Sequence, residues 1–306
     1  MSISNFKVGP GTLRKKEYFY GILFASPVII GYLLFVFAPM LASLGFSFTD
    51  YAVVNKAKFI GIENYVNMFS GKDEFFYRSL AVTTYYVLLS VPLQIIVSFL
   101  TALLLNQNFK GRSLFRTIFY LPTIVPVVAS SMIWLWLFDP DLGVLNSVLK
   151  MLGLPTSQWI YSESSVIPSL AIMSLWSIGG TVVIFLAGLQ DIPVQLYESA
   201  DVDGCRGINK LLHITIPMMT PTIFFNMVMS LINSFQIFSQ AYIMTQGGPN
   251  NSSLFYLFYL YREAFTFSKV GSACAIGWVL FLIILFLTLL VIRSSSMWVY
   301  YEGEVK

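Results

Sequence analysis

Uncharged hydrogen-bonding side chains recur along one apolar stretch of the chain. Asn226, Ser230, Asn233 and Gln240 are separated by four, three and seven residues, and Gln236 lies between the last two. On an α-helix this spacing places most of them in one stripe. Amides and hydroxyls exchange hydrogen bonds with a neutral, hydroxyl-rich solute, so the stripe is a candidate wall of a solute path. The alternative is that these groups bind neighbouring helices, as polar residues do in membrane bundles.

The tryptophans allow two interpretations as well. Indole rings stack on ring-shaped solutes, but they also form belts at membrane–water interfaces. Both interpretations remain open for three of them, Trp134, Trp136 and Trp176. We favour the interfacial belt for Trp159 and Trp298.

Recognisable catalytic motifs are absent. The sequence has no His-Glu-x-x-His metalloprotease motif and no Gly-x-Ser-x-Gly nucleophile motif. The Gly71-Lys72 pair lacks the glycine five residues earlier that a phosphate-binding P-loop requires. Cys205 and Cys274 fall in different predicted compartments, so neither a disulfide nor a metal site is expected. We therefore expect no enzymatic activity, and no cofactor or metal bound by this chain.

The composition is that of a membrane protein. Of the 306 residues, 57% are hydrophobic and 11% are charged, whereas soluble domains carry about 25% charged residues. The net charge of +3 is too small to indicate a nucleic-acid binder. These values exclude a soluble enzyme, a disordered chain and a disulfide-rich secreted domain.

Six stretches without charge are each long enough to cross a bilayer as a helix, so the expected fold is an all-α polytopic membrane protein with six transmembrane helices. The spans are expected at about 19–46, 79–105, 117–138, 164–190, 214–240 and 270–292. The first is about twice as long as the apolar region of a signal peptide, so we expect it to be retained. Residues 254–261 are too short to span, and we expect an aromatic helix there, at the interface or under a loop. Gly179 and Gly180 are expected to allow close helix packing rather than a hinge.

Lysine and arginine determine the expected orientation. Eleven of the eighteen fall on one side of the membrane, which is the cytoplasmic side by the positive-inside rule. The tails at 1–17 and 294–306 and the loop at 191–213 are therefore expected to be cytoplasmic. The segment 18–293 forms the membrane domain between the tails.

The predicted spans carry no charged residue, although ion-coupled transporters usually place ionisable groups there. They also contain neither an arginine ladder nor a potassium-selective Thr-Val-Gly-Tyr-Gly filter. The chain is therefore either a passive pore or is driven by another protein.

The loop at 191–213 is the longest on the predicted inner side. Asp191 and Pro193 are typical of a helix start, and Gly204 or Gly207 suits the left-handed position that ends a helix. The loop should therefore contain a short helix of about three turns, followed by a second short helix that enters the fifth span.

One pattern in this loop is specific. The residues Glu198-Ser199-Ala200-x3-Gly204-x9-Ile214-x-Ile216-Pro217 resemble the EAA loop of ABC importer permeases. Ser199 replaces an alanine of the family pattern and Ile216 replaces a leucine. The alternative is an ordinary amphipathic linker in which Gly204 only ends the helix.

Other segments resemble the carbohydrate branch of that family, the maltose, lactose and glycerol-phosphate type permeases. They are 47–50 and 59–65 in the first outer loop, and 245–250 with 261–265 before the last span. The outer loop at 139–163 is short and leaves no room for the extra outer domain of the maltose-type member.

The resemblance implies a permease subunit in the bacterial inner membrane that forms half of a sugar pore. The expected partners are a second permease subunit in a heterodimer, a separate ATPase dimer that binds ATP and Mg²⁺, an extracytoplasmic solute-binding protein, the sugar and the lipid bilayer. The helix at 194–204 would couple the chain to the ATPase, through the motif residues Glu198, Ser199, Ala200, Gly204, Ile214 and Pro217. Two alternatives are a passive facilitator or channel without an ATPase, and an exporter or enzyme subunit. The sequence does not identify the sugar.

Overall fold

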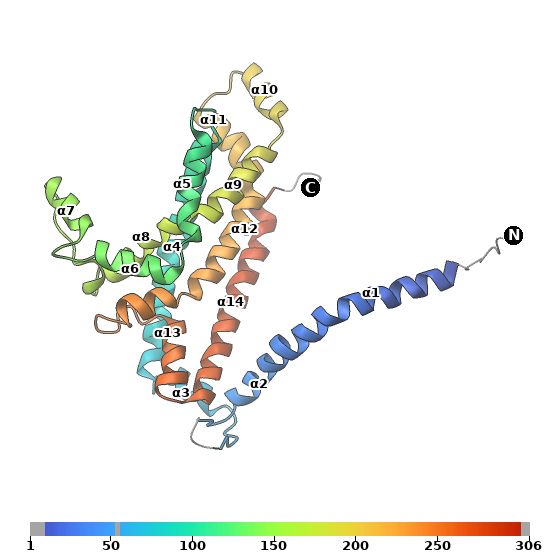
Figure 1. The fold of residues 1–306 in the computed structure, drawn as a ribbon, viewed down its shortest axis with the longest axis vertical. Coiled ribbons are helices and arrows are strands. Elements are labelled where there is room, and N and C mark those ends of the chain that lie inside the picture. The colour runs from blue at the N-terminus through green and yellow to red at the C-terminus, as the bar shows by residue number, and fades with distance from the viewer. Residues whose placement is uncertain (1–9, 53–55, 301–306) are drawn as a thin grey trace, which may run out of the picture.

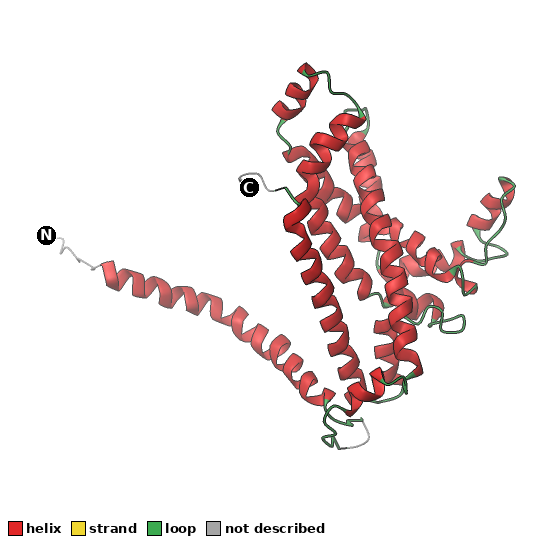
Figure 2. Ribbon diagram, turned by 180° about the vertical axis from the view of Figure 1, so that it is seen from behind, coloured by secondary structure: helices red, strands yellow, loops and turns green. Residues whose placement is uncertain are grey.

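The computed structural model describes residues 10–52 and 56–300, and the ordered elements in these ranges are helical (Figures 1 and 2). Four helices are long and apolar enough to cross a membrane, or up to six if each of two bent helix pairs counts as one span. The architecture is therefore an all-α polytopic membrane protein, as predicted. The predicted tails lie partly outside the described residues, at 1–9 and 301–306.

The first long helix stands apart from the rest of the chain. It consists of α1 (Pro10–Tyr32), a π-helical turn (Leu33–Phe37) and α2 (Ala38–Ser47). None of its most apolar window is buried, and it runs away from the bundle in both views (Figures 1 and 2). Only its α2 end packs extensively, against the last helix of the chain, α14 (Val270–Trp298).

The bundle is built around α4 (Glu74–Asn106), which packs on α8 (Val166–Ser174), α9 (Gly179–Asp191), α12 (Ile216–Phe235) and the shorter α13 (Tyr256–Tyr261). Its beginning is set by Asp73, whose carboxylate accepts the backbone N–H groups of Phe75 and Phe76. Such a cap satisfies donors that have no partner inside the helix.

Two of the predicted spans are bent rather than straight. The helices α5 (Arg112–Ile124) and α6 (Val127–Leu137) meet at 100°, and α8 with its 3-10 extension (Leu175–Ser177) meets α9 at 54°. The first bend coincides with Pro126, because proline disfavours helical conformation in the residue before it.

The fifth predicted span, 214–240, differs from the structure at both ends. A continuous helix runs from α11 (Ile208–Lys210) through the π-helical turn η4 (Leu211–Thr215) into α12, and it ends at Phe235. Gln236 leaves helical geometry and donates its N–H to the carbonyl of Asn233. Residues 239–245 form a separate helical segment that includes the π-helical turn Ala241–Thr245.

The aromatic helix expected at 254–261 exists, and most of its side chains are buried in the core. It is α13, continued by a π-helical turn at Arg262–Thr266. Tyr256 and Tyr259 are almost completely buried and lie between α4 and α14. Burying these large side chains is more favourable than leaving them at a surface.

Short helices complete the chain at α3 (Glu63–Phe69), α7 (Val144–Met151) and Trp159–Tyr161. The buried Asn146 holds the loop around α7. Its Nδ2 donates to the carbonyls of Pro140 and Ser157, and its Oδ1 accepts from the Ser157 N–H and from Trp159 Nε1. Trp159 therefore has a structural role in this loop.

Candidate functional site

The helix α10 (Val194–Val202) lies at one end of the bundle, between α9 and α11 (Figure 1). Pro193 precedes its first turn, whereas Asp191 is the last residue of α9 and does not cap α10, contrary to the prediction. Gly204 has a φ of +74°, and the N–H of Cys205 bonds to the carbonyl of Ala200 at 2.8 Å. The predicted left-handed helix end at Gly204 is therefore confirmed.

One face of α10 is free in this chain. Glu198 and Ser199 are exposed, whereas Ala200 is buried. Apolar side chains are exposed on the same helix, with Val194 at 63% and Val202 at 88% of their full accessible surface. Acidic and apolar groups therefore share a surface that the described residues leave uncovered.

The remaining two motif residues lie elsewhere. Ile214 is in the π-helical turn and Pro217 is at the start of α12, and both are half-buried. The pattern thus consists of an exposed helix, which carries Glu198 and Ser199, and an anchor in the helix that follows.

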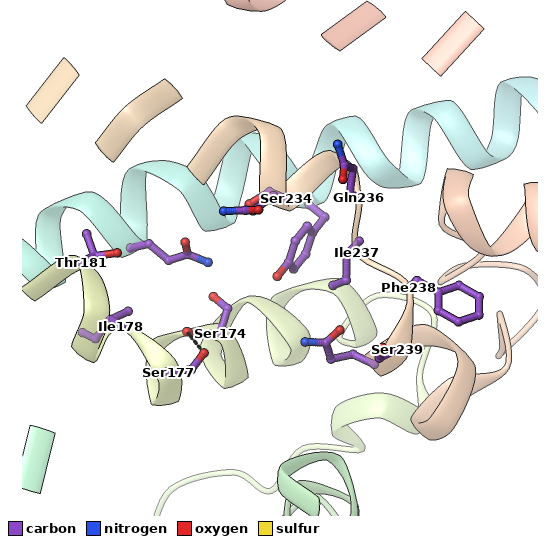
Figure 3. A pocket seen from close by; sticks show the side chains of 13 residues that line it. Ser174, Ser177, Ile178, Thr181, Ser234, Gln236, Ile237, Phe238 and Ser239 are labelled. Carbon is purple, nitrogen blue, oxygen red and sulfur yellow. Dashed lines mark hydrogen bonds between the residues drawn. The ribbon is translucent and has the colours of Figure 1, made fainter. Parts of the chain in front are cut away.

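An uncharged cavity of 310 Å³ lies where α4, α8, α9 and the end of α12 meet (Figure 3). Its wall carries amides and hydroxyls together with a few apolar groups and no charged side chain. The lining residues are Tyr86, Gln94, Ser174, Ser177, Ile178, Thr181, Asn233, Ser234, Gln236, Ile237, Phe238, Ser239 and Gln240.

The structure brings three of the five predicted path residues into this wall. Asn233 and Gln236 come from the end of α12, and Gln240 comes from the next segment rather than from the same helix. Asn226 and Ser230 are buried and do not line the cavity. Asn226 Nδ2 donates to the carbonyl of Thr222 in its own helix, at 2.9 Å, so this bond does not join neighbouring helices.

Sequence reasoning missed the groups that other helices contribute to the wall. Gln94 comes from α4, Ser174 and Ser177 come from α8 and its extension, and Thr181 comes from α9. A signal for the last three was present in the sequence, because their spacings of three and four residues make a second polar stripe.

A second cavity of 320 Å³ shares Tyr86, Ser174, Ser177 and Gln240 with the first and adds the indole of Trp176. Trp134 is buried, and its ring packs edge-on against Trp176 with 6.1 Å between centroids. Trp136 is exposed and lines neither cavity. Of the three tryptophans left open, Trp176 is the one placed to stack on a solute.

A cluster of charged groups lies at the end of the bundle opposite α10, around a cavity of 600 Å³. Asp73 accepts a hydrogen bond from the hydroxyl of Tyr259, and the buried Glu263 lies 3.7 Å from Lys269 Nζ. Burial raises the pKa of Glu263, and the nearby Lys269 ammonium partly opposes this effect. Among the described residues, no three His, Cys, Asp or Glu side chains are grouped to hold a metal ion.

Up to six spans, an uncharged polar cavity and an exposed acidic helix at one end define a membrane transport subunit. Residues 94–298, two thirds of the chain, match the family model "Binding-protein-dependent transport system inner membrane component". The chain belongs to this family. It is a multi-pass permease subunit of an ABC transport system, in which ATP binds to a separate ATPase subunit.

Relatives resemble the chain over almost its whole length. The probable ABC transporter permease protein YesP of Bacillus subtilis is 40% identical over 95% of this chain and 94% of the relative. The arabinooligosaccharides transport system permease protein AraP of the same organism is 29% identical over 92% and 89%. A chain of the bacterial alginate ABC transporter, solved with an alginate pentasaccharide-bound periplasmic protein, is 25% identical, with a TM-score of 0.80 over 92% and 95%. Membership in this family overturns the alternative of a passive facilitator.

Proposed function

We propose that this chain is the permease of an oligosaccharide importer and forms half of its pore. The observation that carries this proposal is the uncharged wall of amides and hydroxyls, which brings Asn233 and Gln236 together with Gln94. Neutral donors and acceptors beside an indole suit the hydroxyls and ring faces of a sugar. Relatives named for arabinooligosaccharides and for trehalose and maltose support the same substrate class.

A second permease subunit would complete the pore. Two features support this partner: the cavity is open to the surface, and the helix Lys15–Ser47 leaves its apolar side chains uncovered. We propose a heterodimer in which the partner chain covers part of this helix and closes the solute path. The lipid bilayer would cover the rest.

The exposed face of α10 is the proposed ATPase contact. Exposed Val194 and Val202 beside Glu198 are unusual for a surface that faces only water, and they are typical of a protein contact. Gly204 and Gly207 have positive φ angles, and the turns that they form separate this helix from the spans. Docking of α10 on a separate ATPase dimer would supply the energy that the chain itself has no site to capture.

The solute would arrive at the opposite end of the bundle. The alginate transporter of similar fold was solved with a sugar-loaded periplasmic protein, and we propose that a binding protein delivers the sugar to this chain in the same way. The tails and the α10 loop would be cytoplasmic, as the distribution of lysine and arginine predicts.

Uptake by the reconstituted transporter tests the proposal. The complete complex in proteoliposomes would be supplied with its binding protein, ATP and labelled arabinotriose, maltose, trehalose or an alginate trisaccharide. Asn233→Leu and Gln94→Leu should each lower uptake by about 2- to 10-fold, the size expected from losing one hydrogen bond between neutral groups. Gln190→Leu is the control, because this exposed amide on α9 lies outside the cavity. Transport of none of these sugars, or equal effects of all three variants, would contradict the proposed path.

A second arm tests the ATPase contact. Glu198→Arg and Gly204→Val should reduce co-purification of the ATPase subunit and abolish ATP-dependent uptake. Normal ATP-driven uptake in both variants would contradict the proposed role of α10.

A further inference from the structure

Two side chains attach α10 to the helix that leads to the cavity. Tyr197 and Asp201 are four residues apart and therefore lie on the same face of α10. The hydroxyl of Tyr197 lies 2.9 Å from Thr215 Oγ1, and Asp201 Oδ1 lies 2.6 Å from Lys210 Nζ. Buried Ala200 lies beside Tyr197 on this side of α10, whereas Glu198 and Val202 are exposed.

The two partner residues flank an irregular turn. Lys210 ends α11, and Thr215 ends the π-helical turn η4 that begins at Leu211. Thr215 is buried, and its hydroxyl also donates to the carbonyl of Lys210 at 3.4 Å. Single π-helical turns inside α-helices are rare and are frequent at functional sites. The helix α10 therefore bridges the one irregular turn between α11 and α12.

The backbone connection from α10 to α11 is not suited to transmitting a displacement. Residues 203–207 lead from α10 to α11 and include two glycines with positive φ, Gly204 and Gly207. No heavy atom lies within 4 Å of the Cβ position of either glycine. This loop is thus unsupported by packing at both glycines, so the side-chain contacts of Tyr197 and Asp201 are the direct connection from α10 to the base of α12.

We propose that Tyr197 and Asp201 are positioning residues that brace α10 against the base of α12. A push on α10 would then move α12 as one body and displace Asn233 at its far end, about 27 Å along the helix from Thr215. This inference rests on the proposed function, in which α10 docks on the ATPase. Tyr197 and Asp201 are not among the named residues of the EAA-like motif. In this proposal they carry the motion of α10 to the cavity.

The effect of the Asp201–Lys210 ion pair on coupling can be measured separately from its effect on folding. The Asp201 side chain is 62% exposed and that of Lys210 is 20% exposed. The pair is therefore partly exposed, and ion pairs near the surface contribute up to about 1 kcal/mol to stability, so a variant with either charge reversed should still fold and insert into the membrane. A loss of coupling in such a variant would reflect the geometry of the brace.

The test uses the complete complex in nanodiscs, with ATP and orthovanadate as the probe. A bimane fluorophore at Gln236→Cys, in a background with Cys205 and Cys274 replaced by serine, reports movement at the cavity when nucleotide is trapped. Asp201→Lys and Lys210→Asp should each reduce the bimane shift per trapped nucleotide by about fivefold, the upper range for an exposed ion pair. The double reversal should restore the shift.

Asp203→Lys is the matched control, because Asp203 is an exposed acid in the same loop that lies outside the brace. It should leave the shift unchanged. Unchanged shifts in the single reversals, or failure of the double reversal to restore the shift, would overturn the brace.

The two proposals fail in different ways. Loss of ATPase co-purification in Asp201→Lys, whatever residue stands at 210, would show that Asp201 binds the ATPase directly. That result overturns the brace and leaves the docking proposal intact. Failure of the docking proposal would instead appear as normal nucleotide-dependent shifts in Glu198→Arg and Gly204→Val.

Discussion

Two adjacent glycines at the start of α9 give the sharpest test of the packing. A Cβ on Gly179 would lie 2.5 Å from the carbonyl oxygen of Phe119 and 2.8 Å from the Cα of Tyr120, both in the backbone of α5. A Cβ on Gly180 would meet only the Cγ2 of Thr123, at 3.8 Å. The predicted role in close packing is therefore confirmed for Gly179, whereas Gly180 faces an ordinary contact.

The geometry gives the size of the effect. Ordinary contacts of a Cβ begin at 3.4 Å, so Gly179→Ala must separate α5 and α9 by roughly 1 Å, because backbone atoms cannot rotate away. Overpacking of this kind costs about 1–3 kcal/mol. Gly180→Ala avoids the clash and gains up to about 1 kcal/mol from the helix propensity of alanine.

Unfolding of both variants in mixed detergent micelles measures the difference directly. We expect Gly179→Ala to lower the free energy of unfolding and Gly180→Ala to leave it equal or higher. Ile178 and Thr181 flank this position and line the cavity, so Gly179→Ala should also slow sugar uptake. An unfolding free energy for Gly179→Ala that equals or exceeds that of Gly180→Ala would refute the reasoning.

Three further outcomes are expected. Gly204→Ala should destabilise the end of α10 by about 1–2 kcal/mol, because φ is positive there. Gly204→Asn should have a smaller effect, because asparagine tolerates positive φ better than alanine. Equal co-purification of the ATPase with the Gly204→Ala and Gly204→Asn variants would contradict the predicted difference. Because the pKa of Glu263 is raised in the folded state, protonation of this carboxyl stabilises the folded protein. This stabilisation is fully present below the unfolded pKa and is lost as pH rises through the raised folded pKa. Glu263→Gln should therefore raise the unfolding temperature at pH 8 and not at acidic pH, whereas a pH-independent difference would show another cause. Asn146→Ala removes four hydrogen bonds and should expose the α7 loop to limited proteolysis, with Ser147→Ala as the control that should not.

The long helices could be predicted from the sequence because charged residues are excluded from segments that lie in lipid. This exclusion placed the long helices α4 and α14, and the glycine at position 204 separately indicated the end of α10. Charge exclusion could not reveal the bends between α5 and α6 or between α8 and α9, because hydropathy carries no direction. Pro126 marked the place of the first bend, but tertiary packing sets its angle.

The cavity could be predicted only in part, for a similar reason. The stripe predicts one surface along α12, yet its beginning, at Asn226, packs into the bundle and only its end, at Asn233, reaches open space. Gln94 and Thr181 join that end from helices distant in sequence. Periodicity describes one helix, whereas a cavity depends on which helices meet.

The π-helical turn at Leu211–Thr215 also constrains the length of the chain. A π turn holds more residues than an α turn, so the helix around it accommodates the surplus without a loop. Deleting one residue from the regular part of α12 would instead rotate the α10 end of the helix by about 100° relative to Asn233. The face that meets the ATPase and the face that lines the cavity would then be out of phase. Insertions and deletions in the regular helix between Thr215 and Asn233 should therefore be excluded even where every contact residue is retained.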